Sequence, residues 1–240
     1  MKFAAVVTAA GTGTRLPLSD KVRAKQFYNL GGWPIYLWSL SRLALHKKIE
    51  KIALVLAPDF RELVEQDLAS LPPELFSDKV LLIDGGATRQ DSVRKSLEAL
   101  ESLNPEYVLV HDAARPFLTE EMIDQSMDLV TEYGACSLAI PVADTVKRGA
   151  ADILGETIDR TGLYLIQTPQ SALFKWLMAA HRHANSNNLS TTDDAGILEA
   201  AGHQVYIVQG SAHNLKLTKP DDLALCQALA TIYSPALKHV

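Results

Sequence analysis

The chain has 240 residues, of which 48% are hydrophobic and 21% charged, and its formal net charge is −5. This acidic balance argues against nucleic acid as the main partner, but it permits a small anionic ligand held by a few clustered cations. No apolar run approaches the ~20 residues of a membrane-spanning helix, so we expect no membrane association. The two cysteines, Cys136 and Cys226, lack the spacing of a disulfide framework or metal cluster, which favours a reducing, cytoplasmic setting.

Six short apolar segments, each bounded by turn residues, are typical of strands buried on both faces. They are Phe3–Thr8, Ile52–Ala57, Val80–Ile83, Tyr107–His111, Ala135–Val142 and Val205–Val208. The first of them loosely resembles a signal peptide, but its apolar stretch is short and we interpret it as a buried strand.

Segments with helical spacing of apolar residues lie between these strands. They are Pro34–His46, Asp59–Ser70, Arg89–Leu103, Thr119–Tyr133, Leu173–Ala184 and Asp221–Ile232. Pro34 suits a first helical turn, and Thr119 is a candidate N-cap followed by two acidic residues. The alternation predicts an α/β fold, a Rossmann-like doubly wound and mostly parallel sheet, whose ligands bind at the carboxyl ends of the strands. We see no repeat or linker, so we expect a single domain over residues 1–240.

Residues 143–164 interrupt the alternation, because they are polar, contain glycines and favour β structure. The segment is long for an ordinary connection. We interpret it as a projecting β-arm within the domain, and such arms often serve in dimerisation.

A glycine-rich turn follows the first strand. The segment Ala9–Arg15 reads AAGTGTR and is followed by Lys21, Arg23 and Lys25. Glycines let backbone N–H groups approach a phosphate, and nearby cations supply positive charge, although an ordinary strand-to-helix turn is the plainer interpretation. The dinucleotide fingerprint would need a glycine at Leu16, and a P-loop would need Gly-Lys-Ser/Thr, so neither a dehydrogenase nor a P-loop enzyme is favoured.

Two further strand ends carry polar residues. Gly85 and Gly86 could admit a flat base against the backbone, with the Ser92 hydroxyl nearby, or they could simply form a turn before a capped helix. Asp112 and Arg115 follow the fourth strand, where a structural ion pair and a ligand contact are both reasonable interpretations.

Other polar pairs carry less weight. His181 and His183 are two residues apart on a helix and do not share a face, so we interpret them as solvated surface. Asp221-Asp222 suits a helix start, and Asp193-Asp194 could orient Thr192 or a basic neighbour. We assign neither pair to a metal.

The motifs AAGTGTR, KQF, GGATRQDSV, VHDAARP, PVADTVKR, TPQ, TDD and NLKLTKPDDLAL occur in this order. The ordered set resembles the 2-C-methyl-D-erythritol 4-phosphate cytidylyltransferase family over nearly the whole chain. The resemblance implies transfer of CMP from CTP to methylerythritol phosphate, giving 4-diphosphocytidyl-2-C-methyl-D-erythritol and pyrophosphate in non-mevalonate isoprenoid biosynthesis. It also implies a homodimer and a Mg²⁺ ion held mainly by the triphosphate, with no assigned protein ligands.

The resemblance implies three sets of site residues. The nucleotide set is Ala9, Ala10, Gly11, Thr12, Gly13, Gly85, Gly86 and Ser92. The catalytic set is Arg15, Lys25 and Lys216. The substrate set is Asp112, Ala113, Arg115, Thr145, Arg160, Thr168 and Thr192, with Arg160 reaching the partner's site.

The chain departs from the family pattern at two places. Ala24 stands where the family has proline, and about three extra residues separate Arg15 from Lys25, so Lys21 or Arg23 could share their work. Ala87 replaces an acidic residue.

The implied reaction needs no general base, because a phosphate monoester is ionised near neutral pH and can attack the α-phosphorus itself. Catalysis then rests on positioning and on charge stabilisation. A cytidylyltransferase for another polyol phosphate, such as ribitol 5-phosphate, and a non-catalytic nucleotide-binding module are the alternatives.

Overall fold

A computed structural model describes residues 1–11, 24–76 and 78–239 of the chain. Its main sheet has seven strands in the order β11-β7-β10-β6-β1-β4-β5. They are β1 (Phe3–Ala9), β4 (Ile49–Leu56), β5 (Val80–Asp84), β6 (Tyr107–Asp112), β7 (Ala135–Pro141), β10 (Tyr164–Leu173) and β11 (Tyr206–Gln209). Neighbouring strands are parallel except at β10, which is antiparallel to both β6 and β7. The predicted mostly parallel α/β sheet is confirmed.

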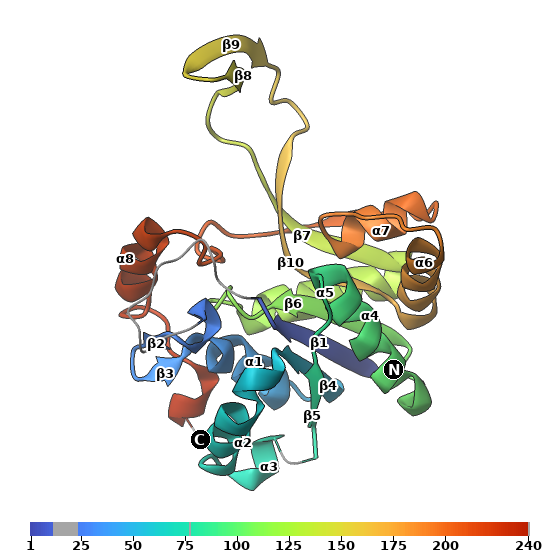
Figure 1. Cartoon of the computed structure of the whole chain (residues 1–240), viewed down its shortest axis with the longest axis vertical. Coiled ribbons are helices and arrows are strands. Elements are labelled where there is room, and N and C mark those ends of the chain that lie inside the picture. Colours follow the sequence, from blue (N-terminus) through green and yellow to red (C-terminus); the bar gives the residue numbers. More distant parts are fainter. Residues whose placement is uncertain (12–23, 77, 240) are drawn as a thin grey trace.

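Helices cover both faces of this sheet (Figure 1). Those packed in one core cluster are α1 (Ile35–Leu45), α2 (Arg61–Ala69), α3 (Pro73–Phe76) and α5 (Glu120–Tyr133). Those of the other cluster are α4 (Arg89–Leu100), α6 (Phe174–Ser186) and α7 (Asp194–Ala200), while α8 (Pro220–Leu229) contributes to a third. The short elements are η1 (Lys25–Phe27), β2 (Asn29–Leu30), β3 (Trp33–Pro34), η2 (Pro58–Phe60), η3 (Glu101–Leu103) and η4 (Ala236–His239).

Strand β1 shows how the sequence divides between the two cores. Successive side chains of a strand point to opposite faces, so Val7 joins the cluster with α1 and α5 while Val6 joins the cluster with α4 and α6. Both are fully buried, which explains the continuous apolar run.

The residues at the two ends of α5 explain where this helix begins and ends. The Thr119 hydroxyl accepts a hydrogen bond from the Met122 N–H at 3.2 Å and caps α5, as predicted. Gly134 ends this helix with a φ of +86°, and a Cβ there would lie 2.4 Å from the Trp176 ring. Only glycine combines that backbone conformation with so close an approach.

The sequence-based prediction missed β10 and α7. The segment Tyr164–Leu173 contains buried polar side chains and Pro169, which argue against a central strand. The pairing of β10 with β7 shifts register between Ile166 and Gln170, and the proline lies in that irregular stretch. The interpretation of His181 as solvated surface was wrong, because its side chain is fully buried.

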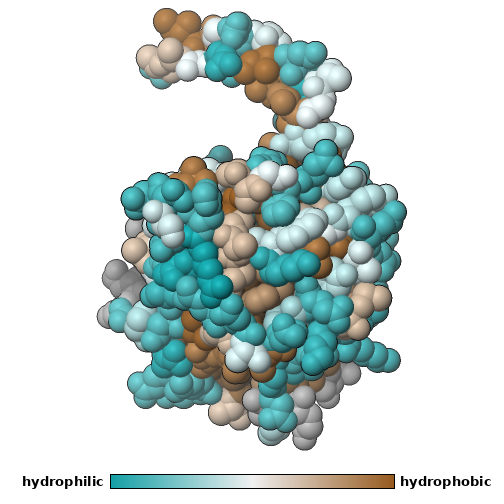
Figure 2. Space-filling view, turned by 90° about the vertical axis from the view of Figure 1, so that its right-hand side faces the viewer, coloured by the Kyte–Doolittle hydropathy of each residue, from teal (hydrophilic) through white to brown (hydrophobic). Residues whose placement is uncertain are grey.

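The projecting arm is a hairpin of β8 (Val146–Ala150) and β9 (Ile153–Ile158). Two extended segments of chain connect it to the main sheet, and it lies away from that sheet (Figure 1). Its tip exposes apolar side chains, since Ile153 and Leu154 are each 75% exposed. Figure 2 shows hydrophobic residues along this arm. Within the described ranges, no helix is long and apolar enough to cross a membrane.

Candidate functional site

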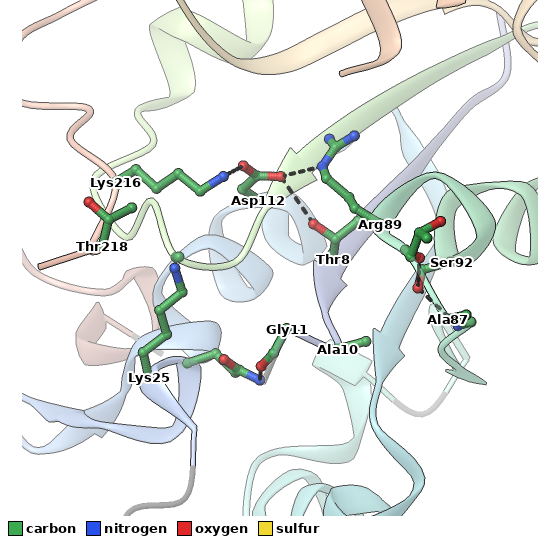
Figure 3. A pocket seen from close by; sticks show the side chains of 14 residues that line it. Thr8, Ala10, Gly11, Lys25, Ala87, Arg89, Ser92, Asp112, Lys216 and Thr218 are labelled. Carbon is green, nitrogen blue, oxygen red and sulfur yellow. Dashed lines mark hydrogen bonds and ion pairs between the residues drawn. The ribbon is translucent and has the colours of Figure 1, made fainter. Parts of the chain in front are cut away.

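A cavity of about 390 Å³ opens at the carboxyl ends of β1 and β6 (Figure 3). From β1 the chain continues to β4 and β5 on one side, and then crosses to β6 on the other side of β1. This reversal of strand order is where open α/β sheets bind ligands. The described residues lining the cavity are Thr8, Ala10, Gly11, Lys25, Gln26, Gly86, Ala87, Thr88, Arg89, Ser92, Asp112, Ala114, Lys216 and Thr218.

Positive charge dominates this cavity. Its described lining includes the cations Lys25, Arg89 and Lys216, against the single carboxylate of Asp112. The excess attracts anions, even though the whole chain is acidic. The predicted residues Ala10, Gly11, Lys25, Gly86, Ser92, Asp112 and Lys216 are all brought together here.

Asp112 lies at the centre of the cationic groups. Its Oδ1 accepts hydrogen bonds from Arg89 Nε at 3.0 Å and from the Thr8 hydroxyl at 3.1 Å, and its Oδ2 accepts from Lys216 Nζ at 2.5 Å. Burial alone would raise the pKa of Asp112, but the charges of Arg89 and Lys216 outweigh it and hold that pKa well below its usual range. The carboxylate therefore stays ionised and fixes both cations.

The Lys216 segment is attached to the end of β6. The Leu217 N–H donates to Ala114 O at 2.9 Å, and Arg115 Nη1 donates to Asn214 O at 2.6 Å. Arg115 thus binds the segment that carries Lys216 and is not part of the cavity lining. Asp222 accepts hydrogen bonds from Thr218 and from the Lys219 N–H, as expected of an acid at a helix start.

The first glycine-rich turn is held by Gln26, a residue whose role the sequence did not reveal. Gln26 is buried, and its Nε2 donates to Ala9 O at 2.5 Å and to Gly11 O at 2.9 Å. Both amide hydrogens are used, which fixes the described end of this turn. Ala9 itself is buried within β1. The predicted residues Thr12, Gly13 and Arg15, together with Lys21 and Arg23, lie outside the described residues.

The second glycine turn packs against the first. A Cβ on Gly85 would lie 2.6 Å from the Ala10 Cβ, and a Cβ on Gly86 would lie 1.9 Å from an Asp91 oxygen. The Ser92 hydroxyl accepts from the Gly86 N–H at 3.0 Å and donates to Thr88 O at 2.9 Å. Ser92 therefore has no proton left to donate, and it offers a ligand only a lone pair.

Thr168 and His111 fix the end of β6 by hydrogen bonds on the side away from the cavity. The Thr168 hydroxyl accepts from the Asp112 N–H at 3.1 Å, so its own proton goes to His111 Nδ1 at 3.1 Å. His111 Nε2 then donates to Arg115 O at 3.1 Å. Thr168 and Ala113 are both buried and do not belong to the cavity lining.

This arrangement requires a neutral His111, and the stability of the protein should depend on it. Burial lowers the pKa of His111 from 6.5 to about 4. Between these values the unfolded chain takes up a proton at His111 and the folded chain does not. The free energy of unfolding should therefore fall by about 3 kcal/mol as the pH drops through this range. Urea unfolding at a series of pH values measures the change.

The matched variants are His111→Gln, which removes the titrating group, and His183→Gln at an exposed position. The first should flatten the pH dependence and the second should leave it intact. An unchanged slope in His111→Gln would assign the dependence to another group.

Three predicted substrate residues lie elsewhere in the chain. Thr145 and Arg160 belong to the arm segment, where Arg160 donates to Ala143 O, and Thr192 is exposed just before α7. None of the three lines the cavity formed by this chain.

The sequence motifs gave Arg89 no role. It is the first residue of α4, where a cation is disfavoured by the positive end of the helix dipole. An arginine at such a position needs anionic partners, and Arg89 has two, Asp112 and Asp194. An arginine at the start of a predicted helix was therefore the one sequence feature that could have indicated these anionic partners.

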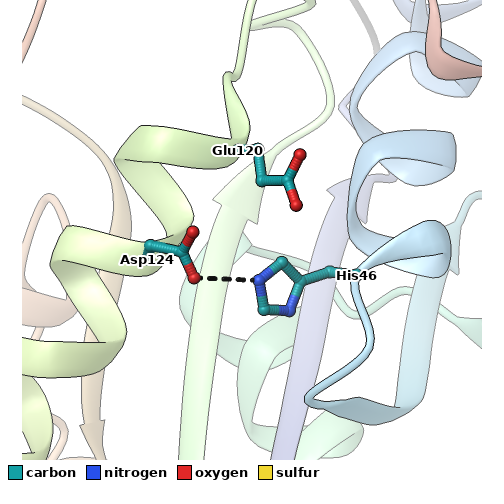
Figure 4. Close-up of side chains that lie close together, drawn as sticks. All are labelled: His46, Glu120 and Asp124. Atoms are coloured by element: carbon teal, nitrogen blue, oxygen red, sulfur yellow. Dashed lines mark hydrogen bonds and ion pairs between the residues drawn. The ribbon is translucent and has the colours of Figure 1, made fainter.

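A possible metal-binding group lies apart from the cavity. The ligand atoms of His46, Glu120 and Asp124 fall within 4.8 Å of one another (Figure 4). His46 Nδ1 accepts from the Lys48 N–H at 3.3 Å, which leaves the ring proton on Nε2, facing Asp124 Oδ1 at 3.2 Å. A metal ion would have to displace that proton, so the present arrangement favours the hydrogen bond.

A family model described as 2-C-methyl-D-erythritol 4-phosphate cytidylyltransferase matches residues 3–231. A protein of that name from Salinibacter ruber is 43% identical over 228 residues, which cover 95% of this chain and 92% of the relative. Another, from Bacillus velezensis, is 39% identical over 230 residues, covering 95% and 96%. The crystal structure of the Thermus thermophilus protein of that name has a TM-score of 0.76 at 30% identity and covers 94% of this chain and 98% of the other.

Proposed function

The chain belongs to the 2-C-methyl-D-erythritol 4-phosphate cytidylyltransferase family, and we infer from this premise that it transfers CMP from CTP to methylerythritol phosphate in the non-mevalonate route. The observation that carries the inference is the cavity at the ends of β1 and β6, with three cations against one carboxylate in its described lining. Two polyanionic substrates require such a place on an otherwise acidic protein.

We propose that a substrate phosphate oxygen attacks the α-phosphorus of CTP. A new phosphorus–oxygen bond forms while the bond to the β-phosphate breaks, and pyrophosphate leaves. Lys25 and Lys216, with Arg15, would hold the charge that develops around the α-phosphate. The chain supplies position and charge and no proton acceptor, since the nucleophile is already ionised.

The two glycine turns suit the nucleotide. Backbone groups of Ala9, Ala10 and Gly11, with Thr12 and Gly13, would follow the triphosphate. The turn at Gly85 and Gly86 packs closely against Ala10 and Asp91, and Gly86 and Ser92 line the cavity where the base would lie. The lone pair on Ser92, whose proton goes to Thr88 O, suits an exocyclic amino group such as that of cytosine.

We propose that Mg²⁺ accompanies the nucleotide and is held mainly by its phosphate oxygens. The described cavity lining has one carboxylate, Asp112, and both of its oxygens already pair with Arg89 and Lys216. The protein side thus offers little to a hard cation, which fits a metal brought by the triphosphate. When bound, Mg²⁺ neutralises charge on the triphosphate and eases departure of pyrophosphate.

Pyrophosphate release from CTP, measured with methylerythritol phosphate and Mg²⁺, tests this function. We expect turnover with methylerythritol phosphate and little with ribitol 5-phosphate. A preference for ribitol 5-phosphate would overturn the substrate assignment. A folded protein that binds CTP but releases no pyrophosphate would be a binding module.

We propose that the arm makes a homodimer. Its exposed apolar side chains, including Ile153, Leu154 and Leu163, need a partner surface to leave water. A second copy would place Arg160, and with it Thr145, beside the neighbouring cavity, where the substrate phosphate needs a cation. Of the other predicted substrate residues, Asp112 lies in the cavity formed by one chain, whereas Arg115 and Thr168 support the end of β6 from outside its lining and Thr192 lies before α7.

Mixing two inactive variants tests this dimer. Arg160→Ala and Lys25→Ala chains should each lose activity, whereas hybrids should regain part of it, because one of their two sites then has both residues. Turnover is measured after unfolding and refolding the mixture, with each variant refolded alone as control. Hybrids that form without regaining activity would remove Arg160 from the partner's site.

We further propose a single nucleotidyltransferase domain and a cytoplasmic location. The sheet supports the first, since β1 pairs directly with β6 and β10 continues it. The second is supported by Cys136 and Cys226, which are both buried as free thiols.

A further inference from the structure

Arg89 connects the cavity to a buried acid behind it. While its Nε contacts Asp112 in the cavity, its Nη1 donates to Asp194 Oδ2 at 2.8 Å. Asp194 is almost fully buried, and its Oδ1 accepts from His181 Nε2 at 3.0 Å. His181 is fully buried on α6. These contacts form an ordered series, His181–Asp194–Arg89–Asp112, that leads from the interior to the site.

The direction of each hydrogen bond in the series is determined. Burial alone would raise the pKa of Asp194, but the charge of Arg89 and the hydrogen bond from His181 lower it. The ionised carboxylate can only accept, so His181 Nε2 must donate. Among the described residues, His181 Nδ1 has no hydrogen-bond partner. The hydrogen bond to Asp194 is therefore the one polar contact that the His181 ring makes among the described residues.

Asp194 itself is held by the start of α7. Gln170 on β10 accepts hydrogen bonds from the Asp194 N–H at 2.8 Å and the Ala195 N–H at 3.0 Å, and Gln170 Nε2 donates to Asp193 at 2.9 Å. The backbone that carries Asp194 is thus fixed to the central sheet. A fixed anion behind Arg89 determines where the guanidinium lies.

We propose that Arg89 is a positioning residue that holds the Asp112 carboxylate beside Lys216, and that Asp194 and His181, outside the cavity, set the position of Arg89. The guanidinium suits this task because its planar fork contacts two carboxylates at once, which an ammonium group cannot reproduce. Loss of the rear contact would let Arg89 turn, and Asp112 and Lys216 would move with it. This inference rests on the proposed function.

A pair of variants at His181 isolates the effect. In His181→Gln the amide nitrogen reaches the position of Nε2 and keeps the donor to Asp194, whereas in His181→Asn it falls short. Both are polar, so their general cost to folding is similar. We expect His181→Asn to lower kcat about 10- to 100-fold, with a small change in the dissociation constant for CTP, and we expect His181→Gln to stay near wild type. His183→Asn, exposed on the same helix, should have no effect.

A double-mutant cycle with Arg89→Lys provides the decisive measurement. If His181 acts through Arg89, then His181→Asn should cost much less kcat in the Arg89→Lys chain than in the wild-type chain. All rates are taken below the unfolding temperature of each variant. Equal costs in both chains, or a His181→Asn chain that unfolds more easily but keeps its kcat, would overturn the proposal. An inactive wild-type chain would instead reject the proposed function.

Discussion

Replacing Lys216 by methionine should lower kcat by about 10²- to 10³-fold, the cost of removing one charged contact to a transition state. The affinity for CTP should change much less, because Lys25 and the backbone groups of the two glycine turns still contact the nucleotide. The stem of methionine preserves the packing beside Asp112, so the loss reports the ammonium group. Single-turnover rates with saturating CTP measure it.

Lys219→Met is the matched control for this change. Lys219 is three residues further along the same segment, exposed, and not part of the described cavity lining. It should turn over like the wild type. If Lys216→Met kept its kcat and lost CTP affinity instead, Lys216 would be a ground-state contact only.

Replacing Asp112 by asparagine should have opposite effects on turnover and on nucleotide affinity. The change removes the single carboxylate of the described cavity lining, so anionic CTP should bind as well as before or more tightly. Turnover should nevertheless fall about 10²-fold, because Arg89 and Lys216 lose the anion that positions them and the reacting groups shift. Calorimetric titration with CTP and steady-state kinetics measure the two effects separately.

Asp84→Asn is the control for this second prediction. Asp84 ends β5 at the same edge of the sheet, but its carboxylate pairs with Arg61 and does not line the cavity. It should change neither quantity. Weaker CTP binding with normal turnover in Asp112→Asn would mean that this carboxylate serves the nucleotide and not the arrangement of the cations.

Elements with a strong periodic signal were predictable, and those stabilised by polar contacts were not. The run Phe3–Ala9 is apolar on both faces, and Thr119 is a local cap, so both could be recognised from neighbouring residues alone. The strand Tyr164–Leu173 could not, because its buried Gln167, Thr168 and Gln170 are satisfied by partners far along the chain.

The candidate site likewise contains residues that could be predicted from the sequence and residues that could not. Asp112, at the end of β6, and Lys216, in the segment before α8, were predicted from motifs that resemble the family, and the fold brings them into one cavity. The residues that orient them were not predicted. His181 is buried because α6 packs against α7. The role of Gln26 depends on hydrogen bonds to two backbone carbonyls that lie fifteen or more positions away in the chain. Single-sequence patterns contain no information about such pairings.

The way the arm is attached to the sheet makes its turn a suitable place to split the chain into two fragments. The hairpin turns at Ala151 and Asp152, both exposed, while the strands that lead to and from it, β7 and β10, pair along the sheet. Opening the backbone at this turn leaves each fragment with one of two strands that recognise each other. Fragments 1–151 and 152–240 should therefore reassemble as a split protein, and the turn is a suitable place for new termini in a circular permutant.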